Sequence, residues 1–379
     1  MPNIIVIADT YNPDKTSGAK LISDILKELT KKNKVILICP REHFLPNSNK
    51  KNLSIYNIYC GPIKSKNFLI RGFFEIFMSI VIWFCTKKYI KEFKPDLLIC
   101  YSPSIFFNYF CKNLLKTAKC KSYLILRDIF PFWIFDIKKI DNFILKFFLI
   151  NYFKTFCNNF DKIGVEAKKN IIFLRKIGIK KKVEHLPNWI STKDFQAKKK
   201  LNRSSYSFIF CGNIGIGQDI TKLNNFINII KNYSFIKFFV CGEGHDKHLL
   251  NIDHNLNNLK LEKAIRYKKL LMKMKHINFG IISLKEEIKT VNFPGKILTY
   301  LLTNTPILIL SNKKNELTEF IETKKIGIRM ADSDDFENIL KKLIQIEKRV
   351  KKNNLDFKKI LNKFFSITIA KKKILSDLS

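Results

Sequence analysis

Ile4-Ile5-Val6-Ile7-Ala8 is a short, uninterrupted apolar run near the start of the chain, and the residues that follow it decide the fold. Asp9 to Ser17 is polar, as expected of a loop, and apolar residues then recur at helical spacing: Leu21, Ile22, Ile25, Leu26 and Leu29. Val35 to Cys39 is a second apolar run. A buried strand, a loop, an amphipathic helix and another buried strand make one βα unit of a parallel sheet.

The same alternation continues along the chain. Strand-like runs follow at Asp96–Cys100, Tyr123–Leu126, Lys162–Val165, Ser207–Cys211, Phe235–Cys241, Asn278–Leu284, Ile307–Leu310 and Lys325–Arg329. They form two sets, separated by the polar and basic residues 191–206, and 379 residues have room for two domains. The sequence therefore predicts two doubly wound, Rossmann-like α/β domains at 1–190 and 207–362 with a central cleft between them. Residues 191–206 would be the linker, and 363–379 a C-terminal helix that packs back on the first domain.

The charge balance and the cysteines indicate which class of partner the protein binds and in which compartment it works. Lys and Arg number 69 and Asp and Glu 32, a formal net charge of +37, so the surface attracts nucleic acid, acidic lipid or a phosphorylated substrate. The nine cysteines show no CxxC pair and no zinc-ligand spacing, which indicates buried thiols in a reducing compartment. Because a strand begins without a basic leader or a cleavage site, we expect a cytoplasmic protein.

One segment is more apolar than a surface helix normally is. Phe73 to Cys85 is apolar almost all round, contains Glu75, and is flanked by Arg71, Lys87, Lys88 and Lys91. It is shorter than the ~20 residues of a spanning helix. Two interpretations remain open, a helix packed in the core and a helix lying in the interface of an anionic membrane. A similar aromatic and basic run, Phe143 to Phe156, favours the second.

Glycine-rich turns follow several strands, at the sheet edge where such folds bind ligands. Cys211-Gly212-Asn213-Ile214-Gly215-Ile216-Gly217 lies between a strand and a helix, where backbone N–H groups and the helix N-terminus can face a diphosphate. Gly242-Glu243-Gly244 has the same context, although it can equally be a tight structural turn. Ser17-Gly18 opens the first helix, either as a helix cap or as a loop facing an acceptor.

The stretch from Glu286 to Leu302 carries the most chemistry. Pro294 stands where a helix would begin, Gly295 would let a ligand approach that helix end, and Lys296 supplies a positive charge. This is the composition of a diphosphate site. Glu286 and Glu287 lie just upstream and either accept hydrogen bonds from sugar hydroxyls or are simply solvated.

A DxD spacing occurs at Asp332-Ser333-Asp334. The amphipathic set Phe336, Ile339, Leu340 and Leu343 follows directly. An aspartate at that place is an ordinary helix cap, so we interpret this motif as a cap and not as a metal site.

Taken together, these pieces resemble the retaining GT-B glycosyltransferases of family 4 over nearly the whole chain. The opening strand with Pro13, Ser17 and Gly18 matches the pattern of that family, as do the runs Leu126–Pro131, Leu186–Trp189, Gly212–Gly215, Gly242–Gly244, Phe293–Tyr300 and Thr305–Leu308. Within the family the chain is most similar to enzymes of bacterial O-antigen and capsule assembly of the N-acetyl-L-fucosamine transferase type.

The resemblance implies roles for individual residues. Gly215, Gly295 and Lys296 would bind the donor diphosphate, within a donor site of Gly212, Asn213, Gly215, Gly242, Glu243, Gly244, Asn292, Phe293, Pro294, Gly295, Lys296 and Thr299. Gly242 to Gly244 would border the base, and Glu286 or Glu287 would contact the donor sugar. Asp128, with a catalytic role, would lie on the acceptor side with Arg127, Ser17 and Gly18.

The chain departs from the family pattern at two positions. Thr299 stands where many members have a glutamate that holds the ribose, and Val291 stands where the first glutamate of the ExxxxxxxE spacing would fall. One possibility is that the Thr299 hydroxyl takes over the contact to the ribose, while Glu286 or Glu287 contacts the donor sugar. The other is that donor binding is altered. The family implies no bound metal and no other cofactor, so Lys296 and helix ends would neutralise the leaving phosphate.

These expectations describe a cytoplasmic enzyme, peripheral on the inner face of the cytoplasmic membrane. It would move a sugar, an N-acetylated deoxyhexose, from a UDP-sugar to a polyprenyl-diphosphate-linked saccharide in O-antigen, capsule or lipopolysaccharide synthesis. Two alternatives remain: a nucleotide-sugar 2-epimerase of the same fold, and a basic nucleic-acid-binding protein. The absence of a helix-turn-helix, RNP or zinc pattern in the sequence argues against the second, so we expect no nucleic-acid partner.

Overall fold

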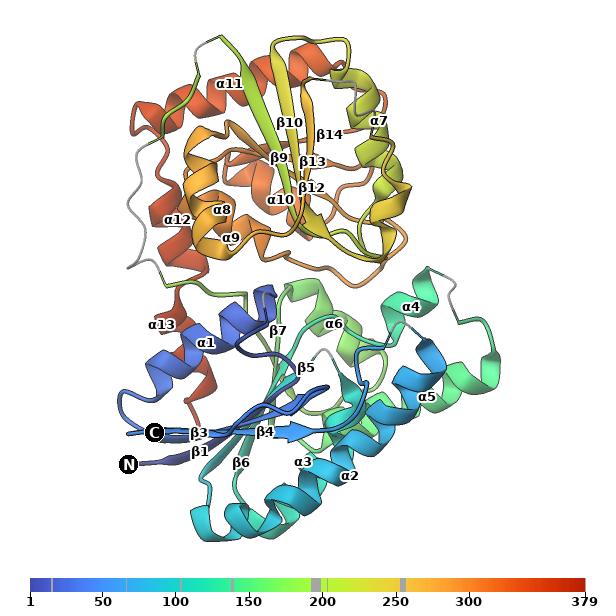
Figure 1. The fold of residues 1–379 in the computed structure, drawn as a ribbon, viewed down its shortest axis with the longest axis vertical. Helices are drawn as coiled ribbons and strands as arrows, with labels where there is room; N and C mark the ends of the chain where they lie inside the picture. The colour runs from blue at the N-terminus through green and yellow to red at the C-terminus, as the bar shows by residue number, and fades with distance from the viewer. Residues whose placement is uncertain are drawn as a thin grey trace. The chain divides into compact units, whose positions relative to one another are not determined.

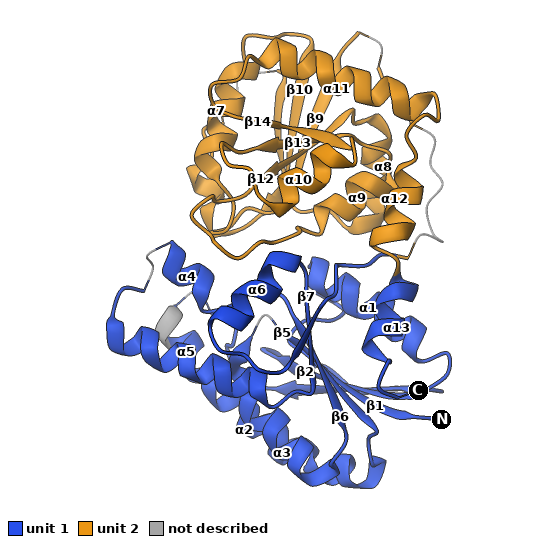
Figure 2. Ribbon diagram, turned by 180° about the vertical axis from the view of Figure 1, so that it is seen from behind, with its two compact units in different colours: residues 1–190, 367–379 blue, residues 191–366 orange. Residues whose placement is uncertain are grey.

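The computed structural model describes residues 1–14, 16–65, 67–102, 104–137, 140–191, 199–202, 204–252 and 257–378. Two compact units make up the chain (Figure 2): Met1–Ile190 with Ile367–Ser379 form unit 1, and Ser191–Ser366 form unit 2. Positions 192–198 and 203 of the expected linker lie outside the described residues.

Unit 1 is built on an eight-stranded sheet in the order β3-β4-β2-β1-β5-β6-β7-β8 (Figure 1). The strands are β1 (Asn3–Ala8), β2 (Lys34–Arg41), β3 (Ser48–Lys50), β4 (Leu53–Tyr59), β5 (Leu97–Ser102), β6 (Lys121–Leu126), β7 (Lys162–Val165) and β8 (Lys182–His185). All neighbours pair in parallel except β3 with β4. The order reverses between β1 and β5, which makes their carboxyl ends the switch point of this sheet.

Helices cover the sheet of unit 1. They are α1 (Ser17–Leu29), α2 (Phe68–Phe93), η1 (Ile105–Phe107), α3 (Asn108–Ala118), α4 (Phe132–Asp136), α5 (Phe143–Asn158), α6 (Lys168–Lys176) and α13 (Ile367–Ile374). The last of these packs against α1, where Lys371 Nζ donates to the carbonyl of Glu28 at 2.9 Å. Lys162 Nζ also contacts Asp377 Oδ1 at 2.6 Å, so the end of the chain returns to unit 1.

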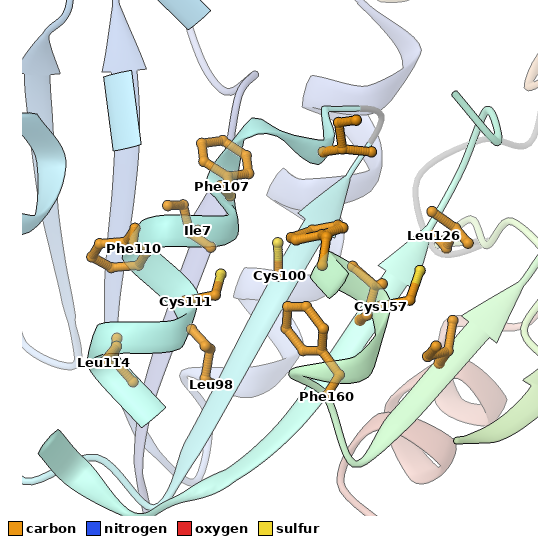
Figure 3. Packing of buried hydrophobic residues seen from close by; sticks show 14 of the residues in the cluster. Ile7, Leu98, Cys100, Phe107, Phe110, Cys111, Leu114, Leu126, Cys157 and Phe160 are labelled. Atoms are coloured by element: carbon orange, nitrogen blue, oxygen red, sulfur yellow. The ribbon is translucent and has the colours of Figure 1, made fainter. Parts of the chain in front are cut away.

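The core of unit 1 explains the scattered cysteines. Cys100, Cys111 and Cys157 lie among Phe107, Phe110 and Phe160 in the apolar cluster between sheet and helices (Figure 3). The nine cysteines are free thiols, and all but Cys85 and Cys120 are buried. Buried thiols behave as small apolar side chains, which confirms the prediction for seven of the nine positions.

Unit 2 holds a six-stranded parallel sheet in the order β11-β10-β9-β12-β13-β14. The strands are β9 (Tyr206–Asn213), β10 (Ile236–Glu243), β11 (Leu259–Glu262), β12 (Phe279–Ser283), β13 (Ile307–Leu310) and β14 (Gly327–Met330). The helices are α7 (Ile220–Ile230), η2 (His245–Leu249), α8 (Tyr267–Lys273), η3 (Met274–His276), α9 (Lys296–Leu302), α10 (Glu316–Thr323), α11 (Phe336–Lys351) and α12 (Phe357–Phe364). Successive strands run outward in both directions from β9 and β12, so the switch point lies between these two strands.

The segment Phe73–Cys85 lies in α2, which has one buried and one exposed apolar face. Met78, Ile82 and Ile90 are buried at helical spacing against the core, whereas Phe73 and Phe77 are exposed. Among the residues searched, no helix combines the length and the apolar character needed to cross a bilayer.

Candidate functional site

The glycine-rich turns after β9 and β10 meet at the carboxyl edge of the sheet in unit 2. Gly212 pairs with Gly242, and Ile214 N donates to the carbonyl of Glu243 at 3.0 Å. A Cβ on Gly242 would lie 2.1 Å from the carbonyl oxygen of Gly212, and one on Gly244 would lie 2.2 Å from that of Ile214. The close packing of two backbones therefore requires both glycines, which gives Gly242-Glu243-Gly244 a structural reason whether or not it borders a ligand.

Gly212 has a different reason to be glycine. Its φ is +111°, a conformation that other residues rarely adopt, and a Cβ there would meet nothing within 4 Å. Gly212 and Asn213 are exposed and Gly215 is buried. The turn thus presents exposed backbone at the switch point, where a ligand of this fold class binds.

The loop after β12 joins this turn. Lys285 N donates to the carbonyl of Gly217 at 3.1 Å, and Gln218 N donates to the carbonyl of Gly215 at 2.8 Å. Lys296 Nζ, from the far end of the same loop, donates to Gln218 Oε1 at 3.1 Å. The structure therefore brings together the glycine turn and Lys296, which the sequence assigned to one donor site.

Lys296 lies in an unusual environment for a cation. Its Nζ is 3.5 Å from the centre of the Phe210 ring, a favourable cation–π distance. Among the described residues no carboxylate pairs with it, and burial lowers the pKa of Lys296 to about 8. A partly desolvated ammonium without a carboxylate partner gains by binding an anion.

The helix after this loop begins two residues later than expected. The sequence placed its start at Pro294, but α9 begins at Lys296, with Gly295 as the residue before it. The Pro294 carbonyl accepts a hydrogen bond from Ile297 N at 3.0 Å, so proline precedes the first turn. Tyr300 anchors the helix: its hydroxyl lies 3.1 Å from the carbonyls of Ile209 and Ile281.

Glu286 and Glu287 differ in their surroundings. Glu286 Oε1 accepts a hydrogen bond from Ser311 Oγ at 3.0 Å and lies 3.6 Å from Lys222 Nζ. Burial opposes its ionisation, but the backbone N–H of Asn312, the Ser311 hydroxyl and the Lys222 charge outweigh burial and lower the pKa of Glu286. Glu287 is exposed and, among the described residues, has no hydrogen-bond or ion-pair partner. Of the two, only Glu287 has a free carboxylate.

Two residues of the expected donor set have buried side chains. Thr299, within α9, is 5% exposed, and Phe293 is 6% exposed and packs against Phe320 with ring centres 5.8 Å apart. Neither side chain presents a surface to a ligand in this structure. The nearby Asn292 and Pro294 are only partly buried.

The Asp332-Ser333-Asp334 motif has structural partners, although not the expected ones. Asp332 Oδ2 contacts Lys222 Nζ at 3.0 Å and Asn312 Nδ2 at 2.7 Å, and Asp334 Oδ2 accepts from Ala331 N at 2.7 Å. The N-cap of α11 is Asp335, whose side chain accepts from Asn338 N. The cap of this helix is therefore the residue directly after the motif, and not an aspartate of the motif itself.

Ser17 and Gly18, which we expected on the acceptor side, lie near the switch point of unit 1. The N-cap of α1 is Thr16, which accepts from Ala19 N at 3.1 Å, so Ser17 is the first helical residue and not the cap. A Cβ on Gly18 would lie 3.0 Å from the hydroxyl oxygen of Tyr101, at the end of β5. Gly18 thereby allows the start of α1 to approach β5.

Arg127 and Asp128 follow β6. Arg127 is 3% exposed, donates through Nη1 to the carbonyl of Leu186 at 2.7 Å, and lies with Nε 3.7 Å from Glu166 Oε1. Asp128 is exposed, with φ of +23°. Strained backbone of this kind concentrates at functional sites. The buried Arg127 is thus tied to the framework, and Asp128 faces outward.

Sequence reasoning missed Asp9. It is the first polar residue after β1, and its buried Oδ1 accepts no hydrogen bond from the described residues. Burial, partly offset by Lys64, raises the pKa of Asp9 to about 7. A carboxyl group with a strongly perturbed pKa at a switch point is a candidate functional group. Its position, directly beyond a fully buried strand, was the signal available in the sequence.

Comparison with known proteins identifies the fold. No family model matches the sequence, and no curated protein matches it. Sucrose-phosphate synthase from Thermosynechococcus elongatus superimposes with a TM-score of 0.72 at 11% identity, over 100% of this chain and 98% of that chain. The lipopolysaccharide outer core galactosyltransferase WaaB gives 0.59 at 12% identity, over 100% and 98%. Anabaena HepE in complex with UDP and glucose gives 0.66 at 10% identity, over 99% and 98%.

These neighbours span both units, so the likeness concerns the whole architecture and not one Rossmann-like half. Their structures are of the GT-B type, and the prediction of two parallel-sheet α/β domains of that type is confirmed. Identities of this size establish the fold alone. The chain has the GT-B fold.

Proposed function

We propose that this protein is a metal-independent, retaining glycosyltransferase that uses a UDP-sugar donor. The observation that carries the proposal is the convergence of Lys296, Gln218 and the 212–218 turn at the switch point of unit 2. Exposed backbone and a cation without a carboxylate partner are what a diphosphate needs. The neighbouring structure of Anabaena HepE contains UDP and glucose, which supports the same donor class.

Catalysis in such a site means stabilising the departing diphosphate. The anomeric C–O bond breaks through an oxocarbenium-like state, so negative charge develops on the leaving phosphate while the sugar becomes positive. Lys296 would neutralise the phosphate. Glu287, whose carboxylate is free, would bind the donor sugar, while Glu286 would hold the loop in place through Ser311 and Lys222.

The acceptor would lie against unit 1. Asp128 is exposed at the end of β6, and Asp9 and Gly18 lie around the end of β1. We propose a polyprenyl-diphosphate-linked saccharide as acceptor, an N-acetylated deoxyhexose as the transferred sugar, and surface polysaccharide synthesis as the role. WaaB, a lipopolysaccharide galactosyltransferase, is one of the structural neighbours. The enzyme would act as a peripheral protein on the inner face of the cytoplasmic membrane.

Titration calorimetry with UDP tests the donor site. Wild type should bind UDP, and Lys296→Gln should weaken binding roughly tenfold to a hundredfold, the usual loss for a hydrogen bond to a charged group. Lys314→Gln removes an exposed lysine of the same unit and should leave the affinity unchanged. Equal affinities for wild type and Lys296→Gln would refute the assignment, and binding of oligonucleotides without UDP binding would favour the nucleic-acid alternative.

A further inference from the structure

Large apolar side chains are exposed on two helices of unit 1. On α2 the most exposed is Phe73, at 57%; on α5, Phe143 is 80% exposed and Phe147 is 63% exposed. Ile76, Phe77, Phe84, Ile144 and Phe148 share this exposure. Monomeric proteins rarely leave so much contiguous apolar surface in water, and a patch of this kind marks an interaction site.

The two helices belong to one surface. Both pack against η1, in which the Phe106 ring lies 6.0 Å from that of Tyr152 in α5. Figures 1 and 2 show α2 and α5 on the same flank of unit 1. The buried stripe of each helix faces the core, with Ile82 in α2 and Phe153 in α5, so the exposed stripes are the outer faces of correctly packed helices.

Charge favours an anionic lipid surface over a second copy of this chain. The apolar face of α2 is bordered by Arg71 at one end and by Lys87, Lys88 and Lys91 at the other, all exposed. Of the two acidic residues in α2, Glu75 is paired with Arg71 at 3.0 Å, and α5 contains none. Self-association through this face would bring like charges together, whereas anionic headgroups would neutralise them.

The aromatic character of the face also fits a bilayer. Phenylalanines dominate its exposed residues, and basic side chains lie beside them, as in Lys87 Nζ, which is 4.7 Å from the centre of the Phe84 ring. Helices that lie in a membrane interface combine a broad apolar face with Lys and Arg at headgroup level. The first two turns of α5 carry the exposed Phe143, Phe147 and Phe148.

This face adjoins the acceptor side of unit 1. Lys64, shortly before α2, binds Asp14 Oδ2 at 3.2 Å in the loop after β1. The charge of Glu75 in α2 is close enough to Asp9 to help raise its pKa. The beginning of α2 and residues 9–14 are therefore neighbours.

We propose that α2 and α5 form the face by which unit 1 docks on an anionic bilayer, with the loop of residues 9–14 held close to the headgroups. A lipid-linked acceptor then reaches the loop without leaving the membrane. The acceptor part rests on the proposed function, whereas bilayer docking stands independently of it.

Vesicle co-sedimentation tests the docking face. The probes are vesicles of phosphatidylethanolamine with phosphatidylglycerol, and vesicles of phosphatidylcholine alone. Wild type should bind the first kind more strongly, and salt should release it, because exposed charges are screened beyond about 10 Å at 0.1 M. The double variant Phe73→Glu with Phe147→Glu should bind at least about tenfold more weakly, since neither position then buries an apolar ring in the bilayer.

Phe44→Glu is the matched control, since Phe44 is a highly exposed phenylalanine of the same unit outside α2 and α5. It should bind vesicles like wild type, and circular dichroism should show all three proteins folded. Equal vesicle binding by the double variant and wild type would overturn the proposal. A wild-type dimer that the double variant converts to a monomer, without any vesicle binding, would also overturn it by assigning the face to a second copy.

Transfer assays separate this proposal from the proposed function. UDP affinity should be the same in the double variant and wild type, because the donor site lies in unit 2. With a long-chain polyprenyl-diphosphate saccharide in vesicles the double variant should lose transfer, and with a short-chain, water-soluble analogue it should keep it. Loss of transfer to both acceptors alike would contradict delivery from the membrane. Failure of wild type to bind UDP would refute the proposed function and with it the acceptor part, and would leave bilayer docking in place.

Discussion

Lys222 in α7 and Glu286 in the loop after β12 lie with Nζ and Oε1 3.6 Å apart, and the same Nζ contacts Asp332 Oδ2 at 3.0 Å. Asn312 closes the ring, because its Nδ2 donates to Asp332 and its backbone N–H donates to Glu286. Four segments of unit 2 are thus joined around one mostly buried lysine. The loop that carries Glu287 and leads to Lys296 is held at its base by this network.

The network predicts different consequences for the two neighbouring glutamates. Glu287→Gln should lower kcat about tenfold to a hundredfold and leave the UDP dissociation constant unchanged, because contacts to the sugar strengthen as charge develops at the anomeric carbon. Steady-state transfer kinetics with calorimetry of UDP checks this. Full activity of Glu287→Gln would show that Glu287 does not act on the donor sugar.

Glu286→Gln should instead reduce stability. Replacing the carboxylate leaves the mostly buried Lys222 with a weaker partner, so we expect a loss of about 1–3 kcal/mol in the free energy of unfolding in urea. Since the folded-state pKa of Glu286 is lowered, the carboxylate stabilises the fold above its ordinary pKa range, and this advantage is lost as pH falls through the folded value. The difference in unfolding free energy between wild type and variant should therefore disappear in acid. A difference that persists unchanged there would contradict the ion-pair explanation.

The pKa of Lys296 sets a pH dependence for donor binding. Burial lowers it to about 8, so the free protein carries the charge at pH 7 and loses it as pH rises through about 8. UDP affinity should be constant near neutrality and fall above that value, because binding an anion must then also take up a proton. Calorimetry in buffers of different ionisation enthalpy would reveal this uptake, and Lys296→Gln should abolish it. An affinity independent of pH between 7 and 9 would show that Lys296 does not face the phosphate.

The sequence predicted much of the architecture because its strands are buried on both faces. β1, β2, β5, β9 and β13 appear as continuous apolar runs, which period and composition reveal directly. β3, β4, β8 and β11 were missed because most of their residues are exposed or only partly buried, so polar side chains interrupt the apolar pattern. Strands of this kind are defined by pairing with a neighbour, which a local pattern does not contain.

The sequence pointed to some of the residues that the structure brings together around the 212–218 turn and missed the contacts that link others. Gly212 and Lys296 can be recognised by residue type and by their places at the end of a strand and the start of a helix. The burial of Thr299, the pairing of Glu286 with Lys222 and the perturbed Asp9 depend on contacts between distant segments. Such contacts have no periodic signal, which is why neither neighbouring glutamate could be chosen from spacing alone.

The glycine turns predict a stability difference. Gly242→Ala would place its Cβ 2.1 Å from the carbonyl oxygen of Gly212, and forcing the two turns apart should cost roughly 1–3 kcal/mol of unfolding free energy. Gly217→Ala is a matched control, since a Cβ there meets nothing within 4 Å. Urea denaturation should show Gly217→Ala close to wild type. A Gly242→Ala protein as stable as that control would mean that the turns are not packed as described.

The last prediction separates a metal-independent site from one built on Asp332. The carboxylate of Asp332 is already occupied by Lys222 and Asn312, and these partners lower its pKa. A divalent ion would have to displace a lysine that is itself mostly buried, whereas Lys296 can neutralise a phosphate without displacing a carboxylate. Transfer should therefore persist in excess EDTA, and Asp332→Asn, which keeps the shape and hydrogen-bonding capacity, should retain most activity while losing some stability. The opposite result would be that EDTA abolishes activity, that Mg²⁺ or Mn²⁺ restores it, and that Asp332→Asn is folded but inactive. In that case a metal, and not Lys296, stabilises the leaving diphosphate.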